Sequence, residues 1–227
     1  HPSSVARPTE IDFGRLDAVS HHSLPQPNQR RRPIRLRERS QLGQAAIVNA
    51  TLVVAMWCIQ FVVTLMPGLY GLVGIRPREL GSLWTILIAP FVHLGWGHLL
   101  SNTVPFFVLG LFILASSWRE WWIATVTVVL GSGLTVWLLS PPWTLTVGAS
   151  GIIFGWFGFL ALRGFLTKDR IQITISVMVL LLYGGMLFGV LPGGDYSWQG
   201  HLGGLLSGLG AAWYLQHNHR RPQLSAT

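Results

Sequence analysis

The sequence predicts an all-α membrane protein, a bundle of six transmembrane helices. Two features of the composition indicate this fold class. Only 11% of the 227 residues are charged, whereas a soluble domain carries about 25%, and the mean hydropathy is +0.47. A third feature is the grouping of apolar residues into long runs, because a helix needs roughly 20 of them to cross a bilayer core of about 30 Å.

The apolar runs define the expected helices in chain order. We expect spans at 44–66, 97–116, 120–139, 148–163, 171–191 and 199–216. Together they make one membrane domain over 44–216. Residues 1–43 are a polar, basic tail with too little apolar surface to fold alone, so we expect this tail to be disordered. Residues 217–227 form a second polar tail.

The distribution of Lys and Arg predicts the orientation in the membrane. Eight of the 16 basic residues lie in the first 39 positions, and positive charge marks the cytoplasmic side of a membrane helix. Six crossings then leave both termini in the cytoplasm. On this topology the cytoplasmic turns carry Arg119, Arg163, Lys168 and Arg170, and the opposite side carries Arg76 and Arg78.

The basic balance, with a pI ≈ 11.0, also raises nucleic acid as a partner. The arginines cluster beside a membrane helix, however, so topology and contact with anionic lipid explain them more simply. We expect membrane lipid as a partner and no nucleic acid. The single cysteine, Cys58, lies within the first span, which excludes a disulfide framework.

The connection at 67–96 is long for a helical bundle, where loops usually have about 2–8 residues. It stays half apolar ("LWTILIAPFVHLGWG"), so we expect it to lie in the membrane interface, the depth that the indoles of Trp84, Trp96 and Trp143 would favour. We expect His93 to hold this loop against the second span through a buried hydrogen bond.

Four polar side chains stand at the starts of membrane spans. His98 and Asn102 begin the second span, Ser150 begins the fourth and His201 begins the sixth. In the expected topology these spans all begin on the non-cytoplasmic side, so the four side chains lie at a similar depth. Polar groups inside a span are costly and therefore indicate a functional site by default.

Small residues beside these side chains predict close helix contact. The fourth span carries a GxxxG motif at 151–155, and the sixth carries GxxxGxxxG at 200–208. Such stripes let two helix backbones approach closely. We expect contact at Gly151 and Gly204 to bring the serine hydroxyl and the histidine imidazole within hydrogen-bond distance.

This pair of residue types indicates nucleophilic catalysis. A serine is a weak nucleophile until a base takes its proton, and histidine is the commonest base. Ser150 begins a helix, where free backbone N–H groups and the positive dipole end stabilise an oxyanion, and His98 and Asn102 add side-chain donors. Because no Asp or Glu lies in the spans near these groups, we predict a Ser150–His201 dyad rather than a triad.

Each feature alone also has a structural explanation. A serine in a membrane helix usually bonds a carbonyl one turn back, and GxxxG mostly means packing. The His98–Asn102 pair would suit an interhelical clamp, and His201 would suit an interfacial anchor. The combination at one depth, on three alternate helices, favours the catalytic interpretation.

Three motifs together resemble the rhomboid family of intramembrane serine proteases. "FVHLGWGHLLSN" is similar to the family's paired-histidine segment ending in HxxxN, "GASG" to its GxSG nucleophile motif, and "GHLGGLLSG" to its last-helix histidine followed by glycines. GxSG alone is a weak signal, because soluble hydrolases carry a similar string. The three motifs in this order on six helices are specific, and the resemblance covers 44–216.

The resemblance implies a role for each matching residue. Ser150 corresponds to the nucleophile and His201 to the general base. Asn102 and His98 correspond to side-chain oxyanion donors that act beside the Ser150 backbone N–H, and Gly148 corresponds to the first glycine of the nucleophile motif.

Two features differ from the family pattern. Phe154 corresponds to an aromatic ring that stacks on the base histidine, and many members have tyrosine there, so Phe154 can stack but cannot donate a hydrogen bond. Many members also carry a Trp-Arg pair in the first loop. Here Arg76, Arg78 and Trp84 stand apart, which leaves the fold of that loop open.

The resemblance further implies hydrolysis of peptide bonds in or near transmembrane helices of membrane-protein substrates, without metal or organic cofactor. Water must reach the site from the non-cytoplasmic face, so we expect a mobile cap in the loop "PGGDYSW", although a plain turn would use the same glycines. The fifth span resembles the family's lateral gate beside the second span, where Gly184, Gly185 and Gly189 would allow bending and would also serve tight packing. The six-span form is typical of bacterial members, which favours a bacterial cytoplasmic membrane.

Other classes of protein remain as alternatives. The main one is a catalytically inactive rhomboid-like protein that binds and guides transmembrane clients, although such proteins typically lack the serine or the histidine. A transporter or channel would need charged or carbonyl-lined sites near the midplane, and the spans hold no acidic residue near their centres. A membrane scaffold whose glycines only pack helices would not explain why four polar side chains gather on one side of the membrane.

Overall fold

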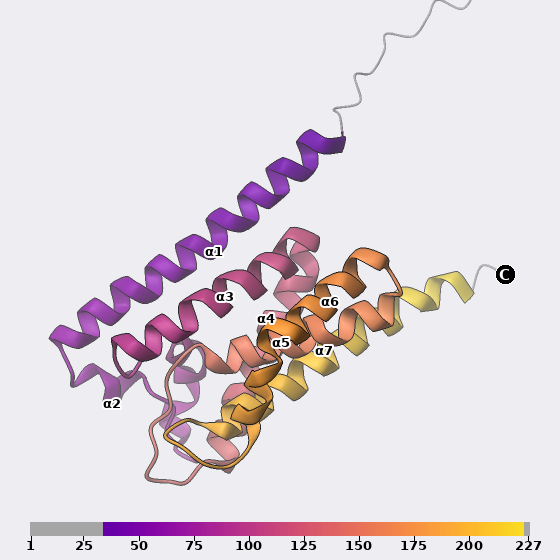
Figure 1. The fold of residues 1–227 in the computed structure, drawn as a ribbon. Coiled ribbons are helices and arrows are strands. Elements are labelled where there is room, and N and C mark those ends of the chain that lie inside the picture. The colour runs from indigo at the N-terminus through magenta and orange to yellow at the C-terminus, as the bar shows by residue number, and fades with distance from the viewer. Residues whose placement is uncertain (1–33, 225–227) are drawn as a thin grey trace, which may run out of the picture.

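The expected helices form a bundle in which most helices run side by side (Figure 1). The computed structural model describes the backbone of residues 34–224 and the side chains of residues 41–218. The α-helices are α1 (Ile34–Leu65), α2 (Leu69–Val73), α3 (Trp96–Ser116), α4 (Trp118–Leu139), α5 (Ser150–Thr167), α6 (Arg170–Tyr183) and α7 (Trp198–Leu224). Short 3-10 helices are η1 (Leu80–Leu87), η2 (Ala89–Phe91) and η3 (Gly184–Val190). The all-α fold class is confirmed.

Five described segments are long and apolar enough to cross a membrane. They are Gln41–Leu65, Trp96–Ser116, Trp118–Leu139, Ser150–Thr167 and Arg170–Val190. The sixth long helix, α7, has sufficient length at 27 residues, but glycine, histidine and glutamine lower its apolar content. It packs against α5 and α4 inside the bundle, so much of its surface meets protein.

The ends of several helices differ from the expected boundaries. α1 begins at Ile34, well before the expected start at 44, so the last part of the predicted tail is helical. α5 begins at Ser150 rather than at 148. α7 continues past 216 to Leu224, through most of the second predicted tail. Residues 1–33 and 225–227 lie outside the described residues.

The fifth expected span is two elements. α6 starts after Asp169, whose side chain accepts the Gln172 N–H at 3.0 Å as an N-cap, and the helix changes to the 3-10 form at Gly184. A side chain at Gly184 or Gly185 would meet nothing within 4 Å. Tight packing, one of the two expected reasons for these glycines, is therefore wrong at both positions.

The long first loop is ordered without a Trp-Arg pair. The Arg78 guanidinium donates to the carbonyls of Leu138 at 3.0 Å and Ser140 at 2.9 Å, at the end of α4. Ile75 forms an isolated antiparallel bridge with Thr146. The loop thereby docks on the end of α4 and on the segment that leads into α5.

The contact between α5 and α7 uses backbone rather than side chains. A Cβ on Gly204 would meet the carbonyl oxygen of Gly151, and one on Gly208 would meet the carbonyl oxygen of Gly155. Because glycine has no Cβ, the two helices approach until their backbones touch. This contact brings the start of α5 against the first turns of α7.

Candidate active site

Ser150 and His201 meet at one end of the bundle. Ser150 is the first residue of α5 and His201 lies in the first turn of α7. The Ser150 Oγ lies 2.9 Å from Nε2 of His201, within hydrogen-bond distance. The imidazole is buried, with 8% of the residue exposed. The structure therefore brings together the two side chains that the sequence pairs.

The second ring nitrogen of His201 has a partner in η3. Nδ1 lies 2.9 Å from the carbonyl oxygen of Gly189. A carbonyl can only accept, so the proton is on Nδ1 and the neutral ring keeps Nε2 as an acceptor for the Ser150 hydroxyl. Sequence reasoning interpreted Gly189 as a bending point and missed this role, because a backbone carbonyl is common to every residue type.

Two aromatic rings stack on the His201 imidazole. Phe154 lies parallel to it at 6°, with ring centroids 4.1 Å apart, as the resemblance implies. Tyr196, from the loop between η3 and α7, stacks at 5.5 Å and 15°. The sequence analysis assigned no role to Tyr196; its only signal was an aromatic residue in the short loop before His201.

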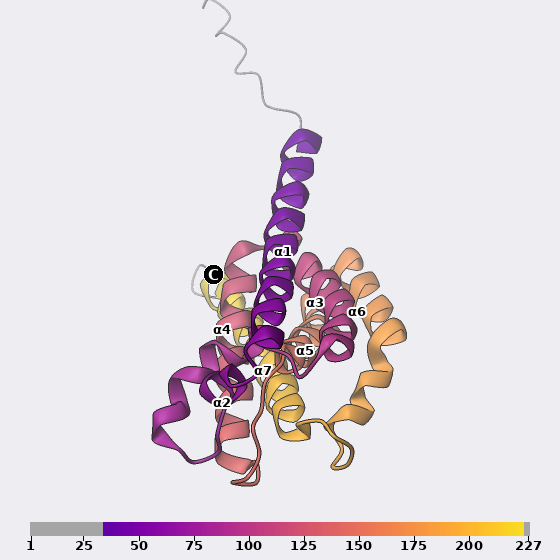
Figure 2. The ribbon, with the colours of Figure 1, turned by 90° about the vertical axis from the view of Figure 1, so that its left-hand side faces the viewer.

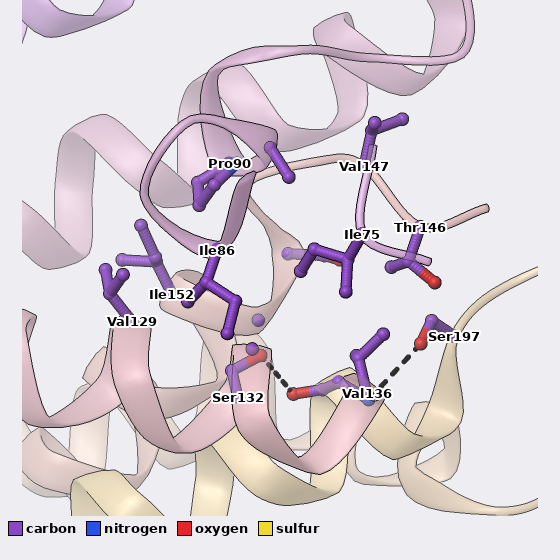
Figure 3. Close-up of a pocket in the computed structure, with 15 residues that line it drawn as sticks. Ile75, Ile86, Pro90, Val129, Ser132, Val136, Thr146, Val147, Ile152 and Ser197 are labelled. Atoms are coloured by element: carbon purple, nitrogen blue, oxygen red, sulfur yellow. Dashed lines mark hydrogen bonds between the residues drawn. The ribbon is translucent and has the colours of Figure 1, made fainter. Parts of the chain in front are cut away.

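Ser132 on α4 fits between the two helices that carry the site. Its hydroxyl donates to the Gly200 carbonyl at 2.8 Å, and the Gly200 N–H donates to the Ser197 Oγ at 3.3 Å (Figure 3). A Cβ on Gly151 would meet the Ser132 hydroxyl. These contacts fix the first turn of α7 against α4, a role for Ser132 that the sequence analysis missed.

The expected oxyanion residues lie beside the pair. Gly148 has φ = +119°, a conformation suited to glycine, and its N–H donates to the Ala89 carbonyl at 2.9 Å. A Cβ there would lie 2.7 Å from Cε1 of His98, so the imidazole of His98 covers this glycine. The side-chain nitrogen of Asn102 donates to the His98 carbonyl at 2.8 Å.

A cavity of about 900 Å³ opens at these residues. Its lining joins the first turns of α3, the loop before α5 and the loop before α7. It includes His98, Asn102, Ser150, Asp195, Tyr196 and His201. Asp195 is exposed on its loop, and the partner of the His201 Nδ1 is the Gly189 carbonyl.

His93 makes its hydrogen bond to the segment before α5 rather than to the second span. It is fully buried and its Nε2 accepts the backbone N–H of Ala149 at 3.3 Å. The predicted hydrogen bond exists, but the expected partner was wrong. The ring of His93 also meets His98 edge-on, with centroids 5.1 Å apart. Burial, helped by the neighbouring His98, lowers the pKa of His93 from 6.5 to about 4, so the ring stays neutral and able to accept.

Among the described residues, no three His, Cys, Asp or Glu side chains converge as metal ligands would. The fold and the site together define a multi-pass helical membrane protein with a serine–histidine pair facing a cavity at one end of the bundle.

Comparison with known proteins assigns the family. The Rhomboid domain model matches residues 80–218, more than half of the chain, and the chain therefore belongs to the rhomboid family. An uncharacterized protein of Mycobacterium tuberculosis is 38% identical over 189 residues, which is 77% of this chain and 78% of that protein.

Two relatives carry names that include the family. Rhomboid-like protease 5 of Toxoplasma gondii is 33% identical over 143 residues, covering 59% of this chain and 16% of that protein. Rhomboid-like protein 11, chloroplastic, of Arabidopsis thaliana is 28% identical over 147 residues, covering 58% of this chain and 52% of that protein.

Proposed function

We propose that this protein is an intramembrane serine endopeptidase that cuts peptide bonds in or near the transmembrane helices of membrane-protein substrates. The observation that carries the proposal is the 2.9 Å contact between the Ser150 Oγ and the His201 Nε2, with Nδ1 bound to the Gly189 carbonyl. A nucleophile, a base and a group that orients the base are the parts that covalent hydrolysis needs.

The first half of the reaction forms an acyl-enzyme. As the Ser150 Oγ attacks the substrate carbonyl, Nε2 of His201 takes the hydroxyl proton. The tetrahedral intermediate then collapses, the C–N bond breaks, and the imidazolium gives its proton to the leaving amine. The products of this half are a free amine and an ester at Ser150.

The second half releases the acid. Water from the cavity attacks the ester, and His201 takes its proton. When the intermediate collapses, His201 returns the proton to the Ser150 oxygen and the carboxylic acid leaves. The cavity of about 900 Å³ beside the pair supports a route for water to the ester.

The oxyanion of each intermediate needs donors at the start of α5. The Ser150 N–H is one of the first N–H groups of a helix, which have no partner within the helix. We infer that it acts together with the side chains of His98 and Asn102, which line the same cavity. Removing one such donor typically costs about 10²–10³-fold in kcat.

The substrate helix would enter beside α6. This helix buries few residues against the bundle and lies at its edge (Figure 2). Glycines 184 and 185 face open space, so they are free to serve as a bending point. We infer that the segment from Gly184 to the start of α7 moves to admit a substrate.

We further propose a bacterial cytoplasmic membrane with both termini in the cytoplasm. The start of α1 and the end of α7 lie toward the same end of the bundle (Figure 1), and the basic residues before α1 suit the cytoplasmic face. The membrane domain of 44–216 then lies between two polar tails. Reporter fusions at each terminus that respond only to cytoplasmic or only to external location test this orientation.

The experiment uses purified protein in liposomes with a labelled single-span substrate. We expect the wild type to cut, and Ser150→Ala and His201→Ala to lose activity. Ser116→Ala and His217→Ala, at the far ends of α3 and α7, are the matched controls and should cut normally. A serine-directed fluorophosphonate should label the wild type but not Ser150→Ala.

The alternative is an inactive rhomboid-like protein that binds and guides transmembrane clients. The hydrogen-bonded pair of Ser150 and His201 disfavours this alternative, because a client-binding protein needs neither the serine hydroxyl nor the histidine base. If the wild type captures a single-span client but neither cuts it nor reacts with the fluorophosphonate, the protease proposal is wrong and this alternative replaces it.

A further inference from the structure

The alignment of the His201 imidazole depends on two hydrogen bonds. Nδ1 is bound to the Gly189 carbonyl and Nε2 to the Ser150 hydroxyl. Rotation of the ring about its Cβ–Cγ bond would weaken both, because it swings Nδ1 away from the carbonyl and Nε2 away from the hydroxyl. Proton transfer requires alignment of donor and acceptor.

Rings stacked on the imidazole restrain this rotation. Phe154 lies at 4.1 Å and Tyr196 at 5.5 Å, both nearly parallel to it. These are the distances at which aromatic pairs attract. Phe154 is a buried residue of α5, whereas Tyr196 is 43% exposed on a loop, so core packing does not account for Tyr196.

The loop is built to hold the Tyr196 ring in place. Gly193 and Gly194 have φ values of +139° and +73°, and the chain bends at residues 194–196 just before α7. A Cβ on Gly194 would lie 2.6 Å from Cε1 of Tyr196, so the ring packs directly on this glycine. The Tyr196 carbonyl accepts the Trp198 N–H at 3.1 Å, which ties the tyrosine to the start of α7.

We propose that Tyr196 is a positioning residue whose ring holds the His201 imidazole in the plane that directs Nε2 at Ser150. It adds a second, more exposed ring to the stacking that Phe154 makes on the imidazole. The inference rests on the proposed protease function for its catalytic consequence. The ring is what acts, since the hydroxyl makes only a long contact, at 3.4 Å, with the Leu191 carbonyl.

The kinetic test compares variants at Tyr196 with the labelled substrate in liposomes. Tyr196→Ala should lower kcat about tenfold and leave KM within about twofold, because it loosens the base without removing a binding group. Tyr196→Phe should restore the wild-type rate. If Tyr196→Ala raises KM alone, or if kcat stays unchanged or rises, the ring covers the site or contacts substrate and the inference is wrong.

A matched pair of glycine variants tests the same point from the loop. Gly194→Ala pushes a methyl group into the Tyr196 ring, whereas Gly193→Ala meets nothing within 4 Å. Both place alanine at a positive φ, and the strain is greater at +139° than at +73°, so Gly193→Ala sets an upper limit on the effect of backbone strain alone. We expect kcat to fall further in Gly194→Ala. Equal losses in the two variants would contradict the role of the ring.

A spectroscopic readout separates this inference from the protease proposal. In ¹⁵N-histidine NMR, with His201→Asn used for assignment, the wild type should give the shifts of one fixed tautomer with the proton on Nδ1. Tyr196→Ala should give shifts averaged between tautomers. If the wild type shows a fixed tautomer but no proteolysis, the proposed protease function is wrong, whereas the role of Tyr196 in positioning the imidazole is still supported. A fixed tautomer in Tyr196→Ala would overturn the inference itself.

Discussion

The carbonyl oxygen of Gly189 lies 2.9 Å from Nδ1 of His201 and accepts its hydrogen bond. In soluble serine proteases a buried carboxylate makes this contact, orients the base and stabilises the imidazolium. A neutral carbonyl supplies the orientation but less of the charge stabilisation. In this protein the residue that orients His201, the proposed base, belongs to η3. We propose that the same segment moves to admit substrate, so entry of substrate and alignment of His201 would both depend on one short stretch of chain.

Gly189→Ala should impair the site although Ser150 and His201 are both retained. The new methyl group would lie 2.7 Å from Cζ of Phe154 and 3.3 Å from Nδ1 of His201, so it displaces the ring or the carbonyl that orients it. We expect the rate of fluorophosphonate labelling to fall by about 10- to 100-fold. Gly210→Ala on α7, which meets nothing within 4 Å and lies outside the segment that we propose moves, is the control. Equal labelling rates in the two variants would count against the carbonyl as the orienting group.

Gly204→Ala should destabilise the bundle. A Cβ at this position runs into the Gly151 carbonyl oxygen, and a helix backbone cannot yield as a flexible side chain can. We expect a loss of about 1–3 kcal/mol in the free energy of unfolding, measured by denaturant titration in detergent micelles.

The matched control for that variant is Gly210→Ala, also on α7. Here a Cβ meets nothing within 4 Å, and alanine is the better helix former by roughly 1 kcal/mol. Stability should therefore be unchanged or slightly higher. If both variants lose the same stability, close contact between α5 and α7 is not what the Gly204 position requires.

The buried His93 should make stability depend on pH. Its pKa is lowered from 6.5 to about 4, so the unfolded chain takes up a proton at a higher pH than the folded protein does. The stabilisation is therefore complete above pH 6.5 and is lost as the pH falls from 6.5 towards 4, by roughly 3 kcal/mol in total.

His93→Gln tests this dependence, because its amide oxygen can still accept the Ala149 N–H but does not titrate. The wild-type advantage in free energy of unfolding should be larger at neutral pH than near pH 4. Stability curves that run parallel for the two proteins across this range would mean that His93 is not the group responsible.

The ion pair of Glu120 and Arg163 should matter for stability and not for catalysis. It lies at the far end of α5 from Ser150, and its side chains are only 16% and 12% exposed. Glu120→Gln leaves the Arg163 charge partly buried without its partner and should cost on the order of 2 kcal/mol. Labelling of Ser150 per folded molecule should not change.

The exposed pair of Arg76 and Glu79 serves as the comparison, with side chains 44% and 56% exposed at 3.5 Å. Glu79→Gln should cost less than about 1 kcal/mol, because water screens the pair. A loss of labelling in Glu120→Gln at full stability would instead tie this ion pair to the site.

Composition and spacing alone predicted the helical membrane fold and the residues Ser150, His201, His98 and Asn102. Both depend on signals carried by residue type. A membrane span is recognised by uninterrupted apolar length, and a hydroxyl or imidazole in such a span stands out because its burial is costly. The glycine stripes similarly predicted the contact of α5 with α7, since only glycine lets backbones meet.

Tertiary structure alone decided how the base is oriented and held. The Gly189 carbonyl has no residue-type signal, because every residue carries one. The contacts of Tyr196 and Ser132 depend on which helices become neighbours. His93 accepts the Ala149 N–H only because the first loop packs on the segment before α5. The chemical groups of side chains can be predicted from the order of residue types in the sequence. Contacts made by backbone atoms and by loop residues cannot, because they form only after distant segments have packed together.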